Sequence, residues 1–463
     1  MQVDWNGRTR ALKVAGVAAL LMVAGAASPV MADEAWDKCT SPEPDIGIAG
    51  CTEVLSRGTQ ETQRDRAIAF RNRGLSYKDK GDYDAAIIDY GEAIALYPEY
   101  VSAYNDLGIA YLAKNDLERA IAAYSAAVRL DPDYSYGYNN RGNAYRDTGE
   151  TALAIADYTQ AIRIDPDYVY AYNGRGNAYQ DQAQYEEAIA DYTEAVRIDP
   201  EYAPAYNGRG NAYRDLGEND LAIADYDRAI AASPDYVLPY NGRGNAYKDL
   251  GQLDLAIADY NKAIELDPNY SFAYNGRANA YAEKGDYELA IADYTQSLRL
   301  DRNYAVAYRN RGLAYDEIGN TDLALRDFDM AIRLNPNYAY AYNDRGIIYD
   351  SQGDYEKAIK DYTAAIEIDP NYTFAYNNRG VAYQNMGNPR RAVDDYEAAL
   401  NIEPGYTRAK ENLDSVLAEL GGTGSKTEMA SPETNRSQVP SGGKSVQPAS
   451  SGPNRSGESL FQL

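Results

Sequence analysis

The sequence predicts an all-α protein: a solenoid of about ten helix-turn-helix repeats with a capping helix at each end. Prolines recur at intervals of 34 residues, small and aromatic side chains recur at helical spacing, and a turn-forming residue separates two helical stretches in each interval. The prolines are Pro98, Pro132, Pro166, Pro200, Pro234, Pro268, Pro336, Pro370 and Pro404, with Arg302 in place of the remaining one. Ten repeats therefore span residues 67–406.

Each repeat contains two stretches that can each bury one helical face. The first stretch of the fourth repeat places four residues at i, i+3, i+4 and i+7: Tyr172, Arg175, Gly176 and Tyr179. The second stretch carries a matching stripe: Ala188, Tyr192 and Ala195. Small residues allow the two backbones to approach, and the ring fills the space that remains.

The repeated positions also resemble a known family. In the second repeat they are Tyr104, Leu107, Gly108, Tyr111, Ala120, Tyr124, Ala127 and Pro132. This pattern resembles the tetratricopeptide repeat (TPR), a helix-turn-helix unit. The resemblance implies a right-handed superhelical stack, in which each unit is stable only when packed on its neighbours.

A residue suited to a left-handed backbone ends the first helix of nearly every repeat. These residues are Gly81, Asn115, Gly149, Gly217, Gly251, Gly285, Gly319, Gly353 and Gly387. Ala183 is the exception, and we expect a strained or different turn there.

The ends of the repeat array are expected to be covered. Residues 33–66 form an N-terminal cap, in which 48–55 align with the second helix of a repeat and Cys51 takes the place of a core tyrosine. Residues 407–420 predict a C-terminal capping helix with Leu413, Val416, Leu417 and Leu420 on its apolar side. Residues 421–463, rich in Gly, Ser and Pro, are expected to be disordered.

The N-terminus predicts export. Residues 1–32 contain basic residues, then a short apolar run, then small residues before a cleavage point after Ala32, as in a signal peptide. The run is too short to span a membrane. We therefore expect a periplasmic or secreted protein with no membrane span after cleavage.

The two cysteines of the chain, Cys39 and Cys51, predict a disulfide bond. Export delivers them to an oxidising compartment, where a lone pair of cysteines usually bonds. The bond would fasten the leading segment to the cap helix. Two buried free thiols are the alternative.

Composition argues against several kinds of function. Asp and Glu total 70 against 45 Lys and Arg, so the formal net charge of −25 disfavours nucleic-acid binding. The chain has no histidine, which removes the commonest general base and metal ligand. With no room for a further domain outside the repeats, we expect no catalytic residues, no metal, no cofactor and no enzymatic activity.

Nine repeats pair an arginine in the first helix with an aspartate 16 residues later, and the second repeat lacks both, with Leu107 and Ala123 instead. Joint loss is typical of contacting partners, because one partner left alone in a partly buried site is costly. The central pairs are Arg141 and Asp157, Arg175 and Asp191, Arg209 and Asp225, and Arg243 and Asp259. We interpret them as structural ion pairs rather than as an anion-binding row.

The opposite face of the first helices carries repeated asparagines, four residues apart in each of five repeats. They are Asn139 and Asn143, Asn173 and Asn177, Asn207 and Asn211, Asn241 and Asn245, and Asn275 and Asn279. The TPR resemblance implies that this face lines a concave, peptide-binding groove, with Tyr136, Tyr170, Leu238 and Phe272 nearby. A carboxamide both donates to and accepts from a peptide bond. Recent duplication of the repeats, or a purely structural bridge between helices, would also explain the ladder.

The resulting hypothesis is a non-catalytic scaffold or adaptor that binds extended segments of other proteins in this groove. The alternative is a structural assembly partner that acts, or self-associates, through its outer face or its tail. The sequence does not determine the partner or the oligomeric state.

Overall fold

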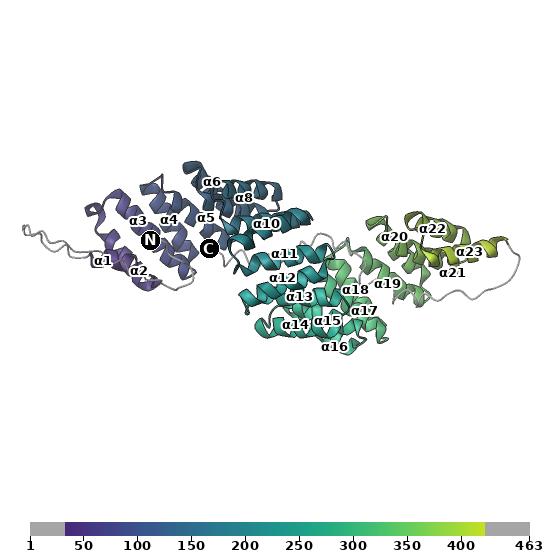
Figure 1. The fold of residues 1–463 in the computed structure, drawn as a ribbon. Helices are drawn as coiled ribbons and strands as arrows, with labels where there is room; N and C mark the ends of the chain where they lie inside the picture. Colours follow the sequence, from purple (N-terminus) through teal and green to yellow (C-terminus); the bar gives the residue numbers. More distant parts are fainter. Residues whose placement is uncertain (1–32, 422–463) are drawn as a thin grey trace, which may run out of the picture. The chain divides into compact units, whose positions relative to one another are not determined.

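The computed structural model describes residues 33–421. The predicted signal segment and nearly all of the predicted tail lie outside this range. Residues 33–421 form twenty-three α-helices and one short 3-10 segment, with no strand among them, which confirms the all-α class (Figure 1). The chain divides into two compact units, residues 1–110 and 111–463, and each is described by itself.

The first unit contains the N-terminal cap and the first repeat. Its helices are α1 (Glu34–Cys39), α2 (Pro44–Ser56), the 3-10 segment η1 (Gly58–Gln60), α3 (Gln63–Asp79), α4 (Tyr83–Leu96) and most of α5 (Val101–Ala113). α3 begins four residues before the first repeated position, because Thr62 caps it by accepting a hydrogen bond from the backbone N–H of Asp65.

The second unit contains repeats three to ten. Its helices from α6 to α14 are α6 (Leu117–Leu130), α7 (Ser135–Asp147), α8 (Thr151–Ile164), α9 (Val169–Asp181), α10 (Tyr185–Ile198), α11 (Ala203–Asp215), α12 (Asn219–Ala232), α13 (Val237–Asp249) and α14 (Leu253–Leu266). The remainder are α15 (Ser271–Glu283), α16 (Tyr287–Leu300), α17 (Ala305–Glu317), α18 (Thr321–Leu334), α19 (Ala339–Ser351), α20 (Tyr355–Ile368), α21 (Thr373–Asn385), α22 (Pro389–Ile402) and α23 (Thr407–Gly421).

Each repeat is a helical hairpin whose two helices pack on each other and on the next repeat. We call the odd-numbered helices from α3 to α21 first helices and their even-numbered partners second helices. A tyrosine of the second helix is fully buried in almost every repeat, and Phe328 takes its place in the eighth. In the fourth repeat this is Tyr192, which packs with Ala188, Ala195 and Ala205. The predicted stacking of hairpins is confirmed.

Glycines let the buried tyrosine touch two first helices at once. A Cβ atom on Gly176, in the same repeat as Tyr192, would lie 2.8 Å from that ring, and a Cβ on Gly208, in the next repeat, would lie 2.6 Å from it. Both distances are too short for a real side chain, so any larger residue would push the helices apart. Three further tyrosines of the second unit are held by glycines in the same way: Tyr158, Tyr226 and Tyr260.

The turns between helices adopt the predicted left-handed backbone. The glycines at these turns have φ between 72° and 85°, and Asn115 has φ 59°. Ala183 also adopts φ 57°, so the turn is kept there at the cost of strain in a residue with a Cβ.

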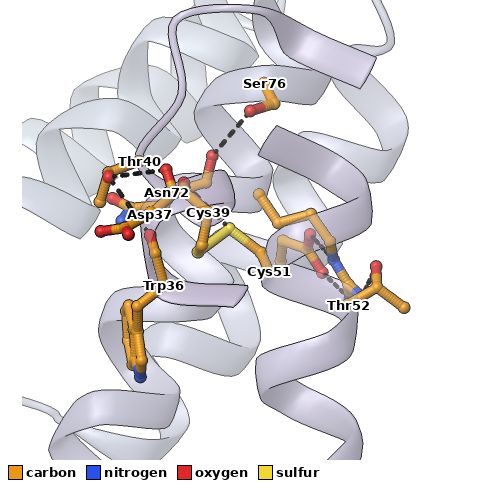
Figure 2. The surroundings of a disulfide bond; sticks show 10 residues. Trp36, Asp37, Cys39, Thr40, Cys51, Thr52, Asn72 and Ser76 are labelled. Atoms are coloured by element: carbon orange, nitrogen blue, oxygen red, sulfur yellow. Dashed lines mark hydrogen bonds and ion pairs between the residues drawn. A yellow bond between two sulfur atoms is a disulfide. The ribbon is translucent and has the colours of Figure 1, made fainter. Parts of the chain in front are cut away.

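The predicted disulfide is present. The sulfur atoms of Cys39, at the end of α1, and Cys51, within α2, are bonded, and both residues are buried (Figure 2). Together with Ala35 and Val54 they form a small core that reaches Ala69 of α3. The bond therefore fastens the leading helix onto the cap helix that covers the first repeat.

The C-terminal helix differs in part from its prediction. α23 packs on the last repeat through Leu413 and the fully buried Val416. Leu417 and Leu420, predicted on the same apolar side, are 47% and 49% exposed. Their placement was wrong because no described helix follows α23 to cover them.

The arginine–aspartate pairs are present in all nine repeats that carry them. The Nε and Nη2 atoms of each arginine donate to the two carboxylate oxygens at 2.6–2.9 Å, as in Arg209 and Asp225. This two-pronged geometry is the strongest arrangement available to the two groups. Each pair joins the two helices of one hairpin.

The sequence analysis missed a third bond that each of these arginines makes. The Nη1 atom donates to a side chain on the second helix of the preceding repeat, as from Arg209 to Thr193 at 3.0 Å. The nine acceptors are Thr52, Ser125, Thr159, Thr193, Asp227, Asn261, Thr295, Asp329 and Thr363. Gly91 holds the equivalent position just before the repeat that lacks the arginine. The arginine therefore fastens successive repeats as well as its own hairpin.

Removing the disulfide should loosen the cap. We expect Cys39→Ser with Cys51→Ser to destabilise α1 and α2 by about 3 kcal/mol, because the bond closes a short loop in the unfolded chain. Hydrogen exchange of residues 34–56 measures this loss. A thiol assay on the denatured, unreduced protein should find no free thiol, and two free groups would contradict the bond.

Breaking one ion pair should cost more than removing both partners. We expect Arg209→Leu to lower stability by about 3 kcal/mol, since Asp225 is then buried without its partner. Adding Asp225→Ala should restore most of the loss, as measured by thermal melts. Additive losses would contradict pairing. The exposed pair Arg197 and Glu194 is the control, and Arg197→Leu should cost less than about 1 kcal/mol.

Candidate functional site

The first helices of the second unit form a continuous surface. From α7 to α17 each first helix contacts the next first helix, and no comparable contact joins successive second helices in this part of the chain. The first helices therefore lie on the closer-packed side of the stack. Side chains at equivalent positions of these helices lie beside one another from repeat to repeat.

The second asparagine of each predicted pair is held by the buried tyrosine of its own repeat. The hydroxyl of Tyr192 donates to Oδ1 of Asn177 at 2.7 Å, and four other repeats contain the same bond at 2.6–2.8 Å. The asparagines held in this way are Asn143, Asn177, Asn211, Asn245 and Asn279. All five are half-buried.

This bond fixes which way the carboxamide points. Burial raises the pKa of Tyr158, Tyr226 and Tyr294 above the ordinary range, so their hydroxyls stay protonated and donate at physiological pH. Because Oδ1 is engaged by the tyrosine, Nδ2 of the same asparagine points away from the ring. The five repeats therefore present a row of oriented amide donors.

The first asparagine of each pair lies deeper than the groove prediction assumed. Asn139, Asn173, Asn207 and Asn275 are only 5–7% exposed, and Oδ1 of each of them, and of Asn241, is buried without a hydrogen bond from the described residues. Leaving an acceptor unpaired in this way costs about 1–3 kcal/mol. These atoms are therefore sites of stored cost in the first helices.

The residue 35 positions later explains four of these unpaired atoms. In the ninth repeat, Oδ1 of Asn343 accepts a hydrogen bond from Asn378 at 3.0 Å. The residues equivalent to Asn378 after Asn139, Asn173, Asn207 and Asn241 are glycines, which have no side chain to donate. Glycine is required there because the buried tyrosine ring occupies the space of a Cβ. Close packing of the helices thus removes the partner.

The predicted aromatic residues lie near the start of the first helices. Tyr136 and Tyr170 are 56% and 44% exposed, and Phe272 is half-buried. Most other tyrosines fill the packing positions that the sequence indicated.

Charged side chains follow the same surface toward the ends of the first helices, and they are paired across repeats. Arg146 lies 3.8 Å from Asp181, and Lys248 lies 3.8 Å from Glu283. The surface is consequently polar and mixed in charge, with no unopposed cationic row.

One carboxylate of this part of the second unit is buried. Asp350, near the end of α19, is 5% exposed, and burial raises its pKa to about 6, opposed by a hydrogen bond with Asn385.

No helix among residues 33–421 combines the length and apolar character needed to cross a membrane. The predicted signal segment lies outside these residues. The disulfide is compatible with export.

Comparison with known families matched most of the repeat region. Residues 142–182, 210–251, 244–285 and 278–319 match the family described as "TPR repeat". Residues 169–202, 305–338, 339–372, 373–406 and 71–135 match models described as "Tetratricopeptide repeat". No curated protein matched the chain.

Solved structures with similar folds include several repeat proteins. The structure of MamA is 33% identical over 36% of this chain and 96% of its own, with a TM-score of 0.33. YrrB, described as "a TPR protein with an unusual peptide-binding site", is 27% identical over 40% of this chain and 96% of its own, with a TM-score of 0.34. The Cut9–Hcn1 structure is 15% identical over 83% of this chain and 95% of its own, with a TM-score of 0.49.

The buried carboxylate of Asp350 should make stability depend on pH. A folded-state pKa raised to about 6 means that the folded protein holds this proton more tightly than the unfolded chain, so stability falls as pH rises from about 4 to 6. We expect Asp350→Asn to stabilise the protein at pH 7.5 by at most about 3 kcal/mol and to change little near pH 4. Thermal melts of both proteins measure this, and an equal gain at both pH values would contradict it.

Proposed function

Because the chain belongs to the tetratricopeptide repeat family, whose members are typically non-catalytic scaffolds that bind other proteins, we propose that it binds extended polypeptide segments along its first helices. The segment would lie across α7, α9, α11, α13 and α15, and the protein would act after export, in the periplasm or outside the cell. The disulfide supports that location.

The single observation that carries this proposal is the repeated tyrosine–asparagine hydrogen bond. It orients five carboxamides in five successive repeats, so that each offers an Nδ2 donor. A polypeptide in extended conformation carries a carbonyl acceptor at every residue, whatever its side chains. A row of fixed donors suits such a ligand, because the donors lose little freedom when it binds.

The donors can be tested without emptying the site. The triple change Asn177→Asp, Asn211→Asp and Asn245→Asp keeps the shape and the oxygen that accepts from tyrosine, but it replaces each donor nitrogen with an oxygen that repels carbonyl groups. We expect at least a tenfold loss of partner binding, with about 1 kcal/mol lost per donor. The melting temperature should change little in comparison.

The chain offers a matched control for the change in charge. Asn261→Asp, on a second helix, puts aspartate where Asp227 and Asp329 already accept from an arginine. This variant should bind as the natural protein does. Equal losses in the triple variant and the control would contradict the proposal.

The partner can be captured with a photoreactive residue in the exported protein. A crosslinker at Asp249, on α13, samples the first-helix surface, and one at the exposed Leu255, on α14, samples the second helices. Crosslinks from Asp249 that the triple variant loses would support the proposal. Crosslinks from Leu255 alone would instead favour assembly through the outer face.

A further inference from the structure

Aromatic rings form an unbroken row at the start of α7, α9 and α11. The row alternates between the loop before each first helix and the helix itself, with neighbouring ring centroids 5.1–6.0 Å apart. Its members are Tyr134, Tyr136, Tyr168, Tyr170 and Tyr202. We call this set the aromatic row. Tyr136 and Tyr170 are its most exposed members, at 56% and 44%.

Elsewhere in the same unit the protein places its own arginine on the equivalent ring. The guanidinium carbon of Arg309, in α17, lies 5.4 Å from the ring centroid of Tyr340, at the start of α19. The Nε atom of Arg309 also donates to Asp344 at 2.6 Å. A ring at this position, with a carboxylate nearby, therefore accommodates a guanidinium group.

In the aromatic row this arginine is replaced. The residue that stands to Tyr170 as Arg309 stands to Tyr340 is Asn139, 31 positions earlier, and the residue equivalent to Asp344 is Gly174. Among the described residues, no arginine or lysine lies over the ring of Tyr170 or Tyr136, although Arg141 and Arg175 lie over Tyr138 and Tyr172. The outer faces of these two rings are consequently open to a cation from another molecule.

The charges around the aromatic row also favour a cation. The loops that precede α7, α9 and α11 carry the exposed carboxylates Asp133, Asp167 and Glu201. In the loops that precede α17, α19 and α21, asparagines hold these positions: Asn303, Asn337 and Asn371. The carboxylates are thus confined to repeats whose rings lack a cation of their own.

The spacing of the rings suits one backbone conformation. Tyr168 lies 5.1 Å from Tyr136 and 5.8 Å from Tyr170, so the two exposed rings are separated by no more than the sum of these distances. First helices in contact have axes about 8–10 Å apart. A polyproline II helix advances about 9 Å in each three-residue turn. Side chains three residues apart on such a segment would therefore meet successive rings.

We propose that the aromatic row binds a basic, proline-rich segment of a partner protein in the polyproline II conformation, with arginine at every third residue stacked on Tyr136 and Tyr170. This inference rests on the proposed function, because it names the chemistry of the segment that the first helices hold. Asp133, Asp167 and Glu201 attract the same arginines. The neighbouring asparagines bind the backbone.

The probe that tests this is a fluorescein-labelled peptide of four Arg-Pro-Pro repeats, measured by fluorescence anisotropy with the full exported protein. Peptides of the same length built from Glu-Pro-Pro, and from arginine alternating with proline, are the comparisons. We expect the Arg-Pro-Pro peptide to bind at least about tenfold more tightly than either. Equal affinity for the acidic peptide or for the alternating peptide would overturn the proposal.

Variants separate the rings from the rest of the surface. Tyr136→Leu with Tyr170→Leu keeps apolar side chains but removes the ring faces, and we expect about a tenfold weaker affinity. The control is Tyr340→Leu with Phe374→Leu, which changes two rings of the same type in the later repeats and should leave affinity unchanged. Equal losses in the two variants would overturn the proposal, and thermal melts establish that both are folded.

A second pair of variants separates local charge from net charge. Asp133→Asn, Asp167→Asn and Glu201→Gln together should weaken binding about tenfold and reduce its dependence on salt. The control removes three exposed carboxylates on second helices: Glu186→Gln, Glu187→Gln and Asp220→Asn. Equal effects of the two triple variants would show attraction by net charge alone and would overturn the proposal.

The outcome also distinguishes this inference from the function on which it rests. If no Arg-Pro-Pro peptide binds, but a partner still crosslinks at Asp249 and depends on the asparagine donors, the inference is wrong and the proposed function stands. If neither binds, both are wrong.

Discussion

The structure depends on one repeated contact, in which a tyrosine ring of each second helix is packed between the glycines of two successive first helices. Tyr192 fills the space above both Gly176 and Gly208, where a Cβ atom would lie less than 3 Å from the ring. The contact sets how closely first helices approach, and the exclusion of water there keeps the hydroxyl protonated. That hydroxyl then orients Asn177. Core packing and the geometry of the candidate binding surface are therefore the same interaction seen from two sides.

The arginines complete this arrangement from the opposite side of the hairpin. Arg209 binds Asp225 in its own repeat and Thr193 in the preceding one, so each arginine fastens its own hairpin and also joins two repeats. The pattern changes where the helices are joined differently. Arg71 binds Asp106 between α3 and α5, and Arg309 binds Asp344 between α17 and α19, in positions where the central repeats have asparagine and glycine. At these two joints an ion pair replaces close packing, and no close contact between the first helices accompanies it.

The same substitution explains why the central repeats differ chemically from the later ones. Glycine at the close contact leaves Oδ1 of Asn139 and Asn173 unpaired, and asparagine in place of arginine leaves the ring of Tyr170 without a cation. Buried unpaired acceptors and exposed rings both reduce stability or solubility, so their repetition in neighbouring repeats favours a role in binding. The paired charges of Arg146 and Lys248 leave the amides and rings as the distinctive groups of this surface.

The sequence by itself determined the helical hairpins, their length, their turns and the arginine–aspartate pairs, because these depend on local spacing and on a period that repeats ten times. It also indicated the partner of Cys39, since only one other cysteine exists. The fixed interval of 15 residues between Asn177 and Tyr192 was visible, but its meaning was not, because spacing does not show which way a carboxamide turns. Only the tertiary structure decided that the first asparagines are buried, that Thr193 completes the arginine network, and that Leu417 and Leu420 stay exposed. These outcomes depend on what the neighbouring repeat places against each residue, which distance along the chain does not reveal.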